Sequence, residues 1–104
     1  MADLYPLWED GTLLLASADV DSDFMDVSDF TGLVLSKTST GGTYAFEIDW
    51  SSDGVTTDTT ETVSVTQNDQ VEQPIANKFA RFRVKETGGS APFTVHKTTV
   101  NGRH

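Results

Sequence analysis

The side chains best suited to chemistry in this sequence are carboxylates. Asp19, Asp21 and Asp23 alternate along the chain, as do the first ligands of a calcium-binding loop. An EF-hand loop also needs Gly at its sixth position and Glu at its twelfth, but Phe24 and Phe30 stand there. The EF-hand pattern therefore fails. A looser cation site stays open beside the interpretation that we favour, an exposed acidic loop over residues 19–29 whose aspartates bond to nearby backbone.

Other residue types that catalyse reactions are scarce. Glu47 and Asp49 share one face of a predicted strand. Paired carboxylates can hydrolyse glycosides, but this pair also suits salt bridges. His96 and His104 are the only histidines, and no cysteine is present. The chain also lacks a phosphate-binding glycine loop and a supported Ser-His-Asp constellation. We therefore predict that it is not an enzyme and has no catalytic residue, metal site or cofactor.

A basic stripe lies on a second predicted strand, residues 78–85. Arg81, Arg83 and Lys85 share its outer face with Phe79. Basic residues with an aromatic can bind nucleic acid, but a net charge of −9 repels it. We favour cross-strand pairing of this stripe with Glu47 and Asp49. We therefore expect no nucleic-acid partner. We also expect no membrane partner, because no apolar run reaches the roughly 20 residues that span a bilayer.

The two strands that carry these charges are the clearest elements. In residues 43–50 and 78–85, large apolar side chains occupy every second position, which places them on one face of a strand. The expected buried residues are Tyr44, Phe46, Ile48 and Trp50 in the first strand and Ala80, Phe82 and Val84 in the second. Ser52 to Gly54 form a turn after the first strand. A sheet with one buried and one solvent face follows.

Weaker patterns complete the predicted fold. Further strands are expected at residues 12–18, 33–35, 62–66 and 92–100, separated by polar links at 36–42, 51–61, 67–73 and 87–91. About seven to eight short strands, with turn signals roughly every 8–12 residues and no long helical pattern, predict an all-β antiparallel β-sandwich or jelly-roll-like fold.

A length of 104 residues suggests a single domain. We expect an N-terminal arm or edge strand over residues 1–12, one sandwich domain over 13–100 and a polar tail over 101–104. Residues 1–36 hold eight acidic residues and no Lys or Arg, which favours a well-solvated surface. The start at Met1, without a basic and apolar leader, suggests an intact gene product that carries no signal peptide.

The N-terminal segment is the candidate contact site. It is unusually apolar for a terminus, since Leu4, Tyr5, Leu7 and Trp8 surround Pro6, and proline fits an edge strand or an extended arm. These four residues either pack on their own domain or bind another subunit. Aromatic anchors dominate many interfaces, so we predict that Leu4, Tyr5, Leu7 and Trp8 bind a partner.

Three segments, covering roughly residues 24–96, carry a family resemblance. They are Asp26-Val-Ser-Asp-Phe-Thr-Gly, Phe46-Glu-Ile-Asp-Trp-Ser-Ser-Asp-Gly, and Phe79-Ala-Arg-Phe-Arg-Val with its Thr-Gly-Gly turn. Together they resemble small β-sandwich modules on the virions of tailed bacteriophages and related viruses. The layout is also similar to discoidin-type carbohydrate-binding sandwiches. The resemblance implies a virion structural role and supplies no catalytic residues.

Two functions follow as expectations. The first is a capsid decoration or cement protein that binds the major capsid protein or another virion structural protein. It would be made in the host cytoplasm and located on the virion, as a homo-oligomer for which we favour a trimer. The alternative is a receptor- or glycan-binding module of a tail or fibre. A closed oligomer would favour the first function, and shifts induced by saccharides would favour the second.

Overall fold

The computed structural model describes residues 4–11, 13–15, 19–39, 44–65, 69–86 and 93–103. These residues form ten strands and no helix. The strands are β1 (Leu4–Asp10), β2 (Leu13–Leu15), β3 (Asp19–Asp21), β4 (Met25–Asp26), β5 (Gly32–Ser39), β6 (Tyr44–Ser51), β7 (Thr59–Val63), β8 (Asp69–Pro74), β9 (Phe79–Glu86) and β10 (Phe93–Arg103).

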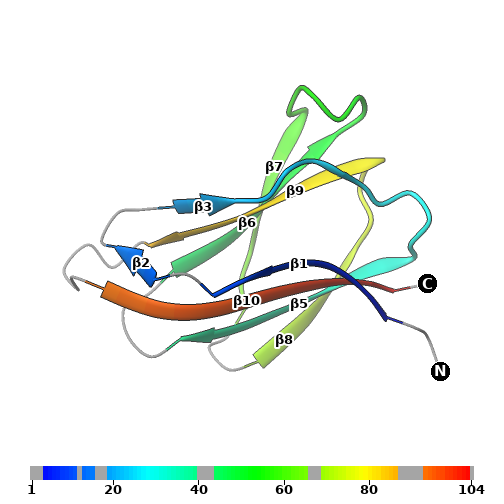
Figure 1. Ribbon diagram of the computed structural model, residues 1–104. Helices are drawn as coiled ribbons and strands as arrows, with labels where there is room; N and C mark the ends of the chain where they lie inside the picture. Colours follow the sequence, from blue (N-terminus) through cyan, green and yellow to red (C-terminus); the bar gives the residue numbers. More distant parts are fainter. Residues whose placement is uncertain are drawn as a thin grey trace.

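The strands form two antiparallel sheets that pack face to face (Figure 1). The first sheet has the order β1-β10-β5-β8, and β2 continues the β1 side by pairing with the start of β10. The second has the order β3-β9-β6-β7, and β4 continues the β3 side of β9. The predicted all-β sandwich is therefore confirmed.

The pairing is nested along the chain. β1 pairs with β10, β3 and β4 with β9, β5 with β8, and β6 with β7. The strands thus pair as one long antiparallel hairpin that folds over on itself. Pairing of β10 with β5 completes the first sheet, and pairing of β9 with β6 completes the second. This connectivity is that of a jelly roll.

The core lies between the two central strands of each sheet. Every predicted inward residue of β6 and β9 is buried, and the largest fully buried side chains include Trp50, Phe46 and Phe82. Leu33, Leu35 and Val100 close the core from the first sheet. Each large side chain contributes about 1.5–3 kcal/mol on burial. The alternating patterns were reliable here because both strands have one face on the core.

The prediction of a loop over residues 19–29 is wrong in part, because two short strands form there at the edge of the second sheet. β3 and β4 form there, separated by Ser22 to Phe24. Val20 lies opposite Val84 and Met25 opposite Ala80, so both pack against the core. At the break, the Ser22 backbone N–H donates to the Phe82 carbonyl, and the Phe82 N–H donates to the Ser22 hydroxyl. The Ser22 hydroxyl thus takes the place of a backbone carbonyl as the acceptor for the Phe82 N–H.

Several predicted links and tails also belong to strands. Residues 36–39 extend β5, Asp69 to Pro74 form β8, and Asn101 to Arg103 continue β10 beside β5. β7 spans Thr59 to Val63, so it begins inside a predicted loop and ends before the strand predicted over residues 62–66 does; Val63 and Val65 are both buried. These segments are mostly polar, and distant backbone partners place them in the sheets. The predictions for residues 12, 16–18, 40–43, 66–68 and 87–92 fall outside the described residues.

Among the described residues, polar contacts also join the sheets at two places beyond the apolar core. The Glu61 carboxylate accepts hydrogen bonds from the Trp50 indole at 3.0 Å and from the Gln73 amide at 2.8 Å. It therefore ties β7 to β8, the neighbouring edges of the two sheets. Near the other end of the strands, Lys37 Nζ donates to the Tyr44 carbonyl, while the Tyr44 hydroxyl donates to the Thr38 carbonyl. Burial lowers the pKa of Lys37.

Candidate interaction surface

The four N-terminal residues predicted to bind a partner lie on β1, the edge strand of the first sheet. Leu4 and Tyr5 are 52% and 56% exposed. Leu7 and Trp8 are partly buried and pack against the core. The Trp8 ring stacks on Phe82 of the other sheet, with centroids 6.3 Å apart and planes 17° apart. Leu4 and Tyr5 are therefore the exposed members of the four, while Leu7 and Trp8 hold β1 in place.

A β-bulge at Leu7 determines which face of the sheet these side chains point to. The pairing of β1 with β10 shifts between Pro6 and Trp8, so that Tyr5 lies opposite Gly102 and Trp8 opposite Val100. Residues three apart on a regular strand point to opposite faces. The extra residue brings Tyr5 and Trp8 to the same face, whereas Leu4, opposite Arg103, points to the outer face. Edge bulges and Pro6 also hinder pairing with further strands.

Tyr5 rests on a packed support. Its ring lies 5.9 Å from the Phe30 ring, centroid to centroid. Phe30 in turn covers Gly102 so closely that a Cβ there would meet the Phe30 ring at 2.6 Å. The Thr31 N–H donates to the Arg103 carbonyl at 2.7 Å and fixes the link beside them. The exposed side of Tyr5 is thus presented from a rigid base.

A third exposed apolar residue, Val55, stands on the link between β6 and β7 and is 81% exposed. Asp53 Oδ1 accepts hydrogen bonds from the Val55 and Thr56 N–H groups at 2.8 Å and from the Ser51 hydroxyl at 2.9 Å. These bonds, led by those to the two backbone N–H groups, lower the pKa of Asp53 to about 2. The loop is therefore well ordered, and Asp53 is ionised at neutral pH.

The outer face of the second sheet holds a charge network. Asp49 is 1% exposed, and its carboxylate accepts hydrogen bonds from Thr60, Arg81 and Arg83. Arg83 also pairs with Asp21 at 3.2 Å and with Glu47 at 3.4 Å. The predicted pairing of the basic stripe with Glu47 and Asp49 is confirmed.

This network suits structure better than acid–base chemistry. Burial raises the pKa of Asp49, but hydrogen bonds from Arg83, Arg81 and Thr60 outweigh it and hold the pKa below its ordinary value. The same bond to Asp49 raises the pKa of Arg83. A general base works best with a pKa near the working pH. Asp49 therefore fixes β6, β7 and β9 to one another.

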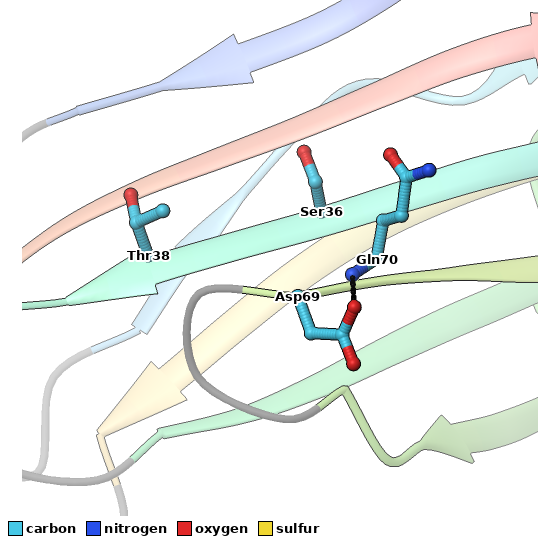
Figure 2. A pocket seen from close by; sticks show the side chains of 4 residues that line it. All are labelled: Ser36, Thr38, Asp69 and Gln70. Carbon is cyan, nitrogen blue, oxygen red and sulfur yellow. Dashed lines mark hydrogen bonds between the residues drawn. The ribbon is translucent and has the colours of Figure 1, made fainter.

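A shallow hollow on the first sheet is lined by Ser36, Thr38, Asp69 and Gln70 (Figure 2). The Ser36 and Thr38 hydroxyls stand on the same side of β5, whereas the Asp69 side chain points away from them. One Asp69 oxygen accepts the Gln70 N–H at 2.8 Å. Two hydroxyls and one side-chain amide thus point the same way, and none of the four described lining residues is aromatic.

The remaining candidate residues do not come together. The segment with Asp19, Asp21 and Asp23 is an interrupted edge, and among the described residues no group of three or more His, Cys, Asp or Glu side chains is placed to hold a metal ion. Asp26 instead accepts the N–H and hydroxyl of Ser28, which lower its pKa. This local bonding is the kind expected for the acidic segment. His104 lies outside the described residues, and only the backbone of His96 is placed, in β10.

Val55 and the hollow are the features that sequence reasoning missed. Val55 is a lone apolar residue within a polar stretch, and this was a usable signal for an exposed contact. The hollow had no such signal, because Ser36 and Gln70 become neighbours only when β5 pairs with β8.

Comparison of the chain with protein-family models, curated proteins and solved structures finds no match. Within the part of the chain that the structure describes, no helix is long and apolar enough to cross a membrane.

Proposed function

We propose that this chain is a non-enzymatic virion structural protein, a capsid decoration or cement protein that attaches through the β1 edge. The observation that carries the proposal is the exposed pair Leu4 and Tyr5 on an edge strand that Trp8 and Phe30 hold in place. Apolar residues presented from a rigid support bind with little loss of conformational entropy. The jelly roll is also an architecture of viral capsid domains, which supports the proposal by analogy of fold.

In this proposal the β1 edge is buried against the major capsid protein or against a neighbouring copy. Two exposed apolar side chains give a weak contact, so function depends on many copies on one lattice. Clustering as a closed homo-oligomer, with a trimer favoured, would match the local symmetry axes of a capsid.

Capsid co-sedimentation with Leu4→Asp tests the proposal. The capsids are bare particles, made by deleting this gene from the viral genome that encodes it. Leu4 points outward and is half exposed, so the variant should fold normally but lose at least about tenfold in binding, because a charge would be buried at the contact. Ala76→Asp makes the same charge change at another exposed position and should bind like the wild type.

Trp8 is unsuitable for this test, because removal of its ring would open the core against Phe82. A substitution there would cost about 3–5 kcal/mol of stability and would mix unfolding with lost binding. Equal binding of the wild type and Leu4→Asp, or no binding of the wild type, would overturn the proposal.

The alternative is a glycan-binding module of a tail or fibre, for which the polar hollow of Figure 2 is the specific observation. Hydroxyl and amide groups can bond to sugar hydroxyls. NMR titration with a panel of saccharides would then shift the amides of Ser36 and Gln70, and a Ser36→Ala, Thr38→Ala variant would abolish the shifts. Unchanged spectra across the panel would exclude this alternative.

A further inference from the structure

Among the residues whose side chains the structure describes, three large apolar ones are more than half exposed: Leu4, Tyr5 and Val55. They form two separate sites. Leu4 and Tyr5 lie on β1 of the first sheet, and Val55 lies on the link between β6 and β7 of the second sheet. Figure 1 shows that link projecting from the top of the molecule, while β1 lies lower in the other layer. One molecule therefore cannot cover one site with the other.

The link around Val55 is built to keep its shape, and we name residues 52–58 the Val55 loop. Besides the bonds to Asp53, the Asp58 carboxylate accepts the Ser52 N–H at 2.8 Å, and the Asp58 N–H donates to the Trp50 carbonyl at 2.8 Å. Gly54 has a φ of +76° and lies so close to Phe79 that a Cβ would meet the ring at 3.1 Å. A contact made by such an ordered loop avoids the entropy cost of ordering it.

The two sites differ in the charged groups beside them. Asp53 and Asp58 flank Val55, and both are exposed. Beside Leu4 lies Arg103, its cross-strand partner, with a side chain that is 41% exposed and pairs with Glu72. An apolar tip with acidic flanks thus matches an apolar edge with a neighbouring guanidinium. Such complementarity favours the correct orientation of two surfaces.

We propose that the Val55 loop of one copy binds the Leu4–Tyr5 edge of the next copy. This inference rests on the proposed function, in that it names a second copy as the occupant of the β1 edge. The contact is heterologous, because two different surfaces meet. Heterologous contacts close into rings when the rotation between copies allows it, and otherwise continue as open chains. A ring of three would be the closed oligomer favoured above.

Mixing of two variants tests the proposal with purified protein alone. Leu4→Asp disrupts the contact surface on the β1 edge but leaves the Val55 loop intact. Val55→Asp disrupts the contact surface on the loop but leaves the β1 edge intact. Sedimentation velocity is measured from about 10 µM to about 1 mM, because a contact this small is weak. The wild type and the control Ala76→Asp should associate as concentration rises, while each variant alone should stay monomeric. An equimolar mixture of Leu4→Asp and Val55→Asp should form a one-to-one dimer that does not grow further.

Rescue by mixing is specific to a contact between two different surfaces. Contacts between like surfaces, edge to edge or loop to loop, would leave the mixture no larger than its components. A monomeric wild type over the whole range, association of Val55→Asp like that of the wild type, or a monomeric mixture of folded variants would each overturn the inference. Capsid binding by the wild type that Leu4→Asp abolishes would then still support the proposed function, with the capsid protein at the β1 edge.

Discussion

At the scale of single residues, the clearest constraint is the close approach of Gly102 and Phe30. Gly102→Ala should lower the free energy of unfolding by about 1–3 kcal/mol, because the added methyl would displace the Phe30 ring. Gly32→Ala is the matched control, since its Cβ would meet no atom closer than 3.5 Å. Urea unfolding compares the two variants. Equal effects would contradict the packing described for this end of the sandwich.

A second prediction at this scale concerns Asp49. Asp49→Asn should lower the free energy of unfolding at pH 7 by about 3 kcal/mol, because a buried carboxylate that pairs with two arginines is lost. Glu47→Gln removes a partly exposed partner and should cost less than about 1 kcal/mol. Urea unfolding at pH 7 measures both, and an equal cost would argue against the central place of Asp49.

The contribution of Asp49 to stability should decrease as the pH falls. Its pKa is lower in the folded chain than the ordinary value of 3.8. The unfolded chain therefore takes up the proton first as the pH falls, and the stabilisation present above pH 3.8 is lost as the pH drops through the folded pKa. Asp49→Asn should flatten, but not abolish, the loss of stability in acid, because the pKa values of Asp26 and Asp53 are also lowered. An unchanged acid profile would contradict the assigned direction.

At the scale of elements, Ser22 keeps β3 and β4 on the same edge of β9. Ser22→Ala should cost about 1–3 kcal/mol, because the buried N–H of Phe82 would lose its acceptor. Hydrogen exchange at the Phe82 amide should accelerate in the same variant. Ser28→Ala, which removes an exposed hydroxyl bonded to Asp26, should change stability by less than about 0.5 kcal/mol. Protection of the Phe82 amide that persists in Ser22→Ala would contradict this role.

The elements differ in how well the sequence predicts them. β6 and β9 are predictable because a core on one side imposes a period of two on their residues. The sequence does not predict β3, β4 and β8. Each of these strands has one apolar residue that packs on the core, namely Val20, Met25 and Val71 in turn, and its other residues are polar. Their pairing partners lie far along the chain, at β9 and β5. Local residue patterns carry little information on such distant pairing.

The candidate site shows the same limit. Leu4, Tyr5, Leu7 and Trp8 stand out in the sequence as apolar residues near a terminus. Their orientations depend on the bulge at Leu7, and the packing of Tyr5 and Trp8 depends on Phe30 and Phe82, which lie far along the chain. Sequence patterns therefore indicate the segment as a candidate, and the three-dimensional structure shows that Leu4 and Tyr5 are its exposed residues.

At the scale of the whole molecule, the three arginines are already paired with carboxylates. Arg81 and Arg83 are paired with carboxylates on the second sheet, and Arg103 pairs with Glu72 on the first. The surplus of acidic groups still gives a net charge of −9, which keeps separate copies apart in dilute solution. Weak contacts that act only when copies are concentrated on a lattice are consistent with this charge.

The central claim is that the β1 edge is a protein-binding surface on a virion. The most direct test is a cryo-electron microscopy reconstruction of gene-deleted capsids to which the purified protein has been added back. The account predicts ordered density for the jelly roll, with Leu4 and Tyr5 buried against another protein chain. Bound protein whose β1 edge faces solvent, or capsids without added density, would contradict it.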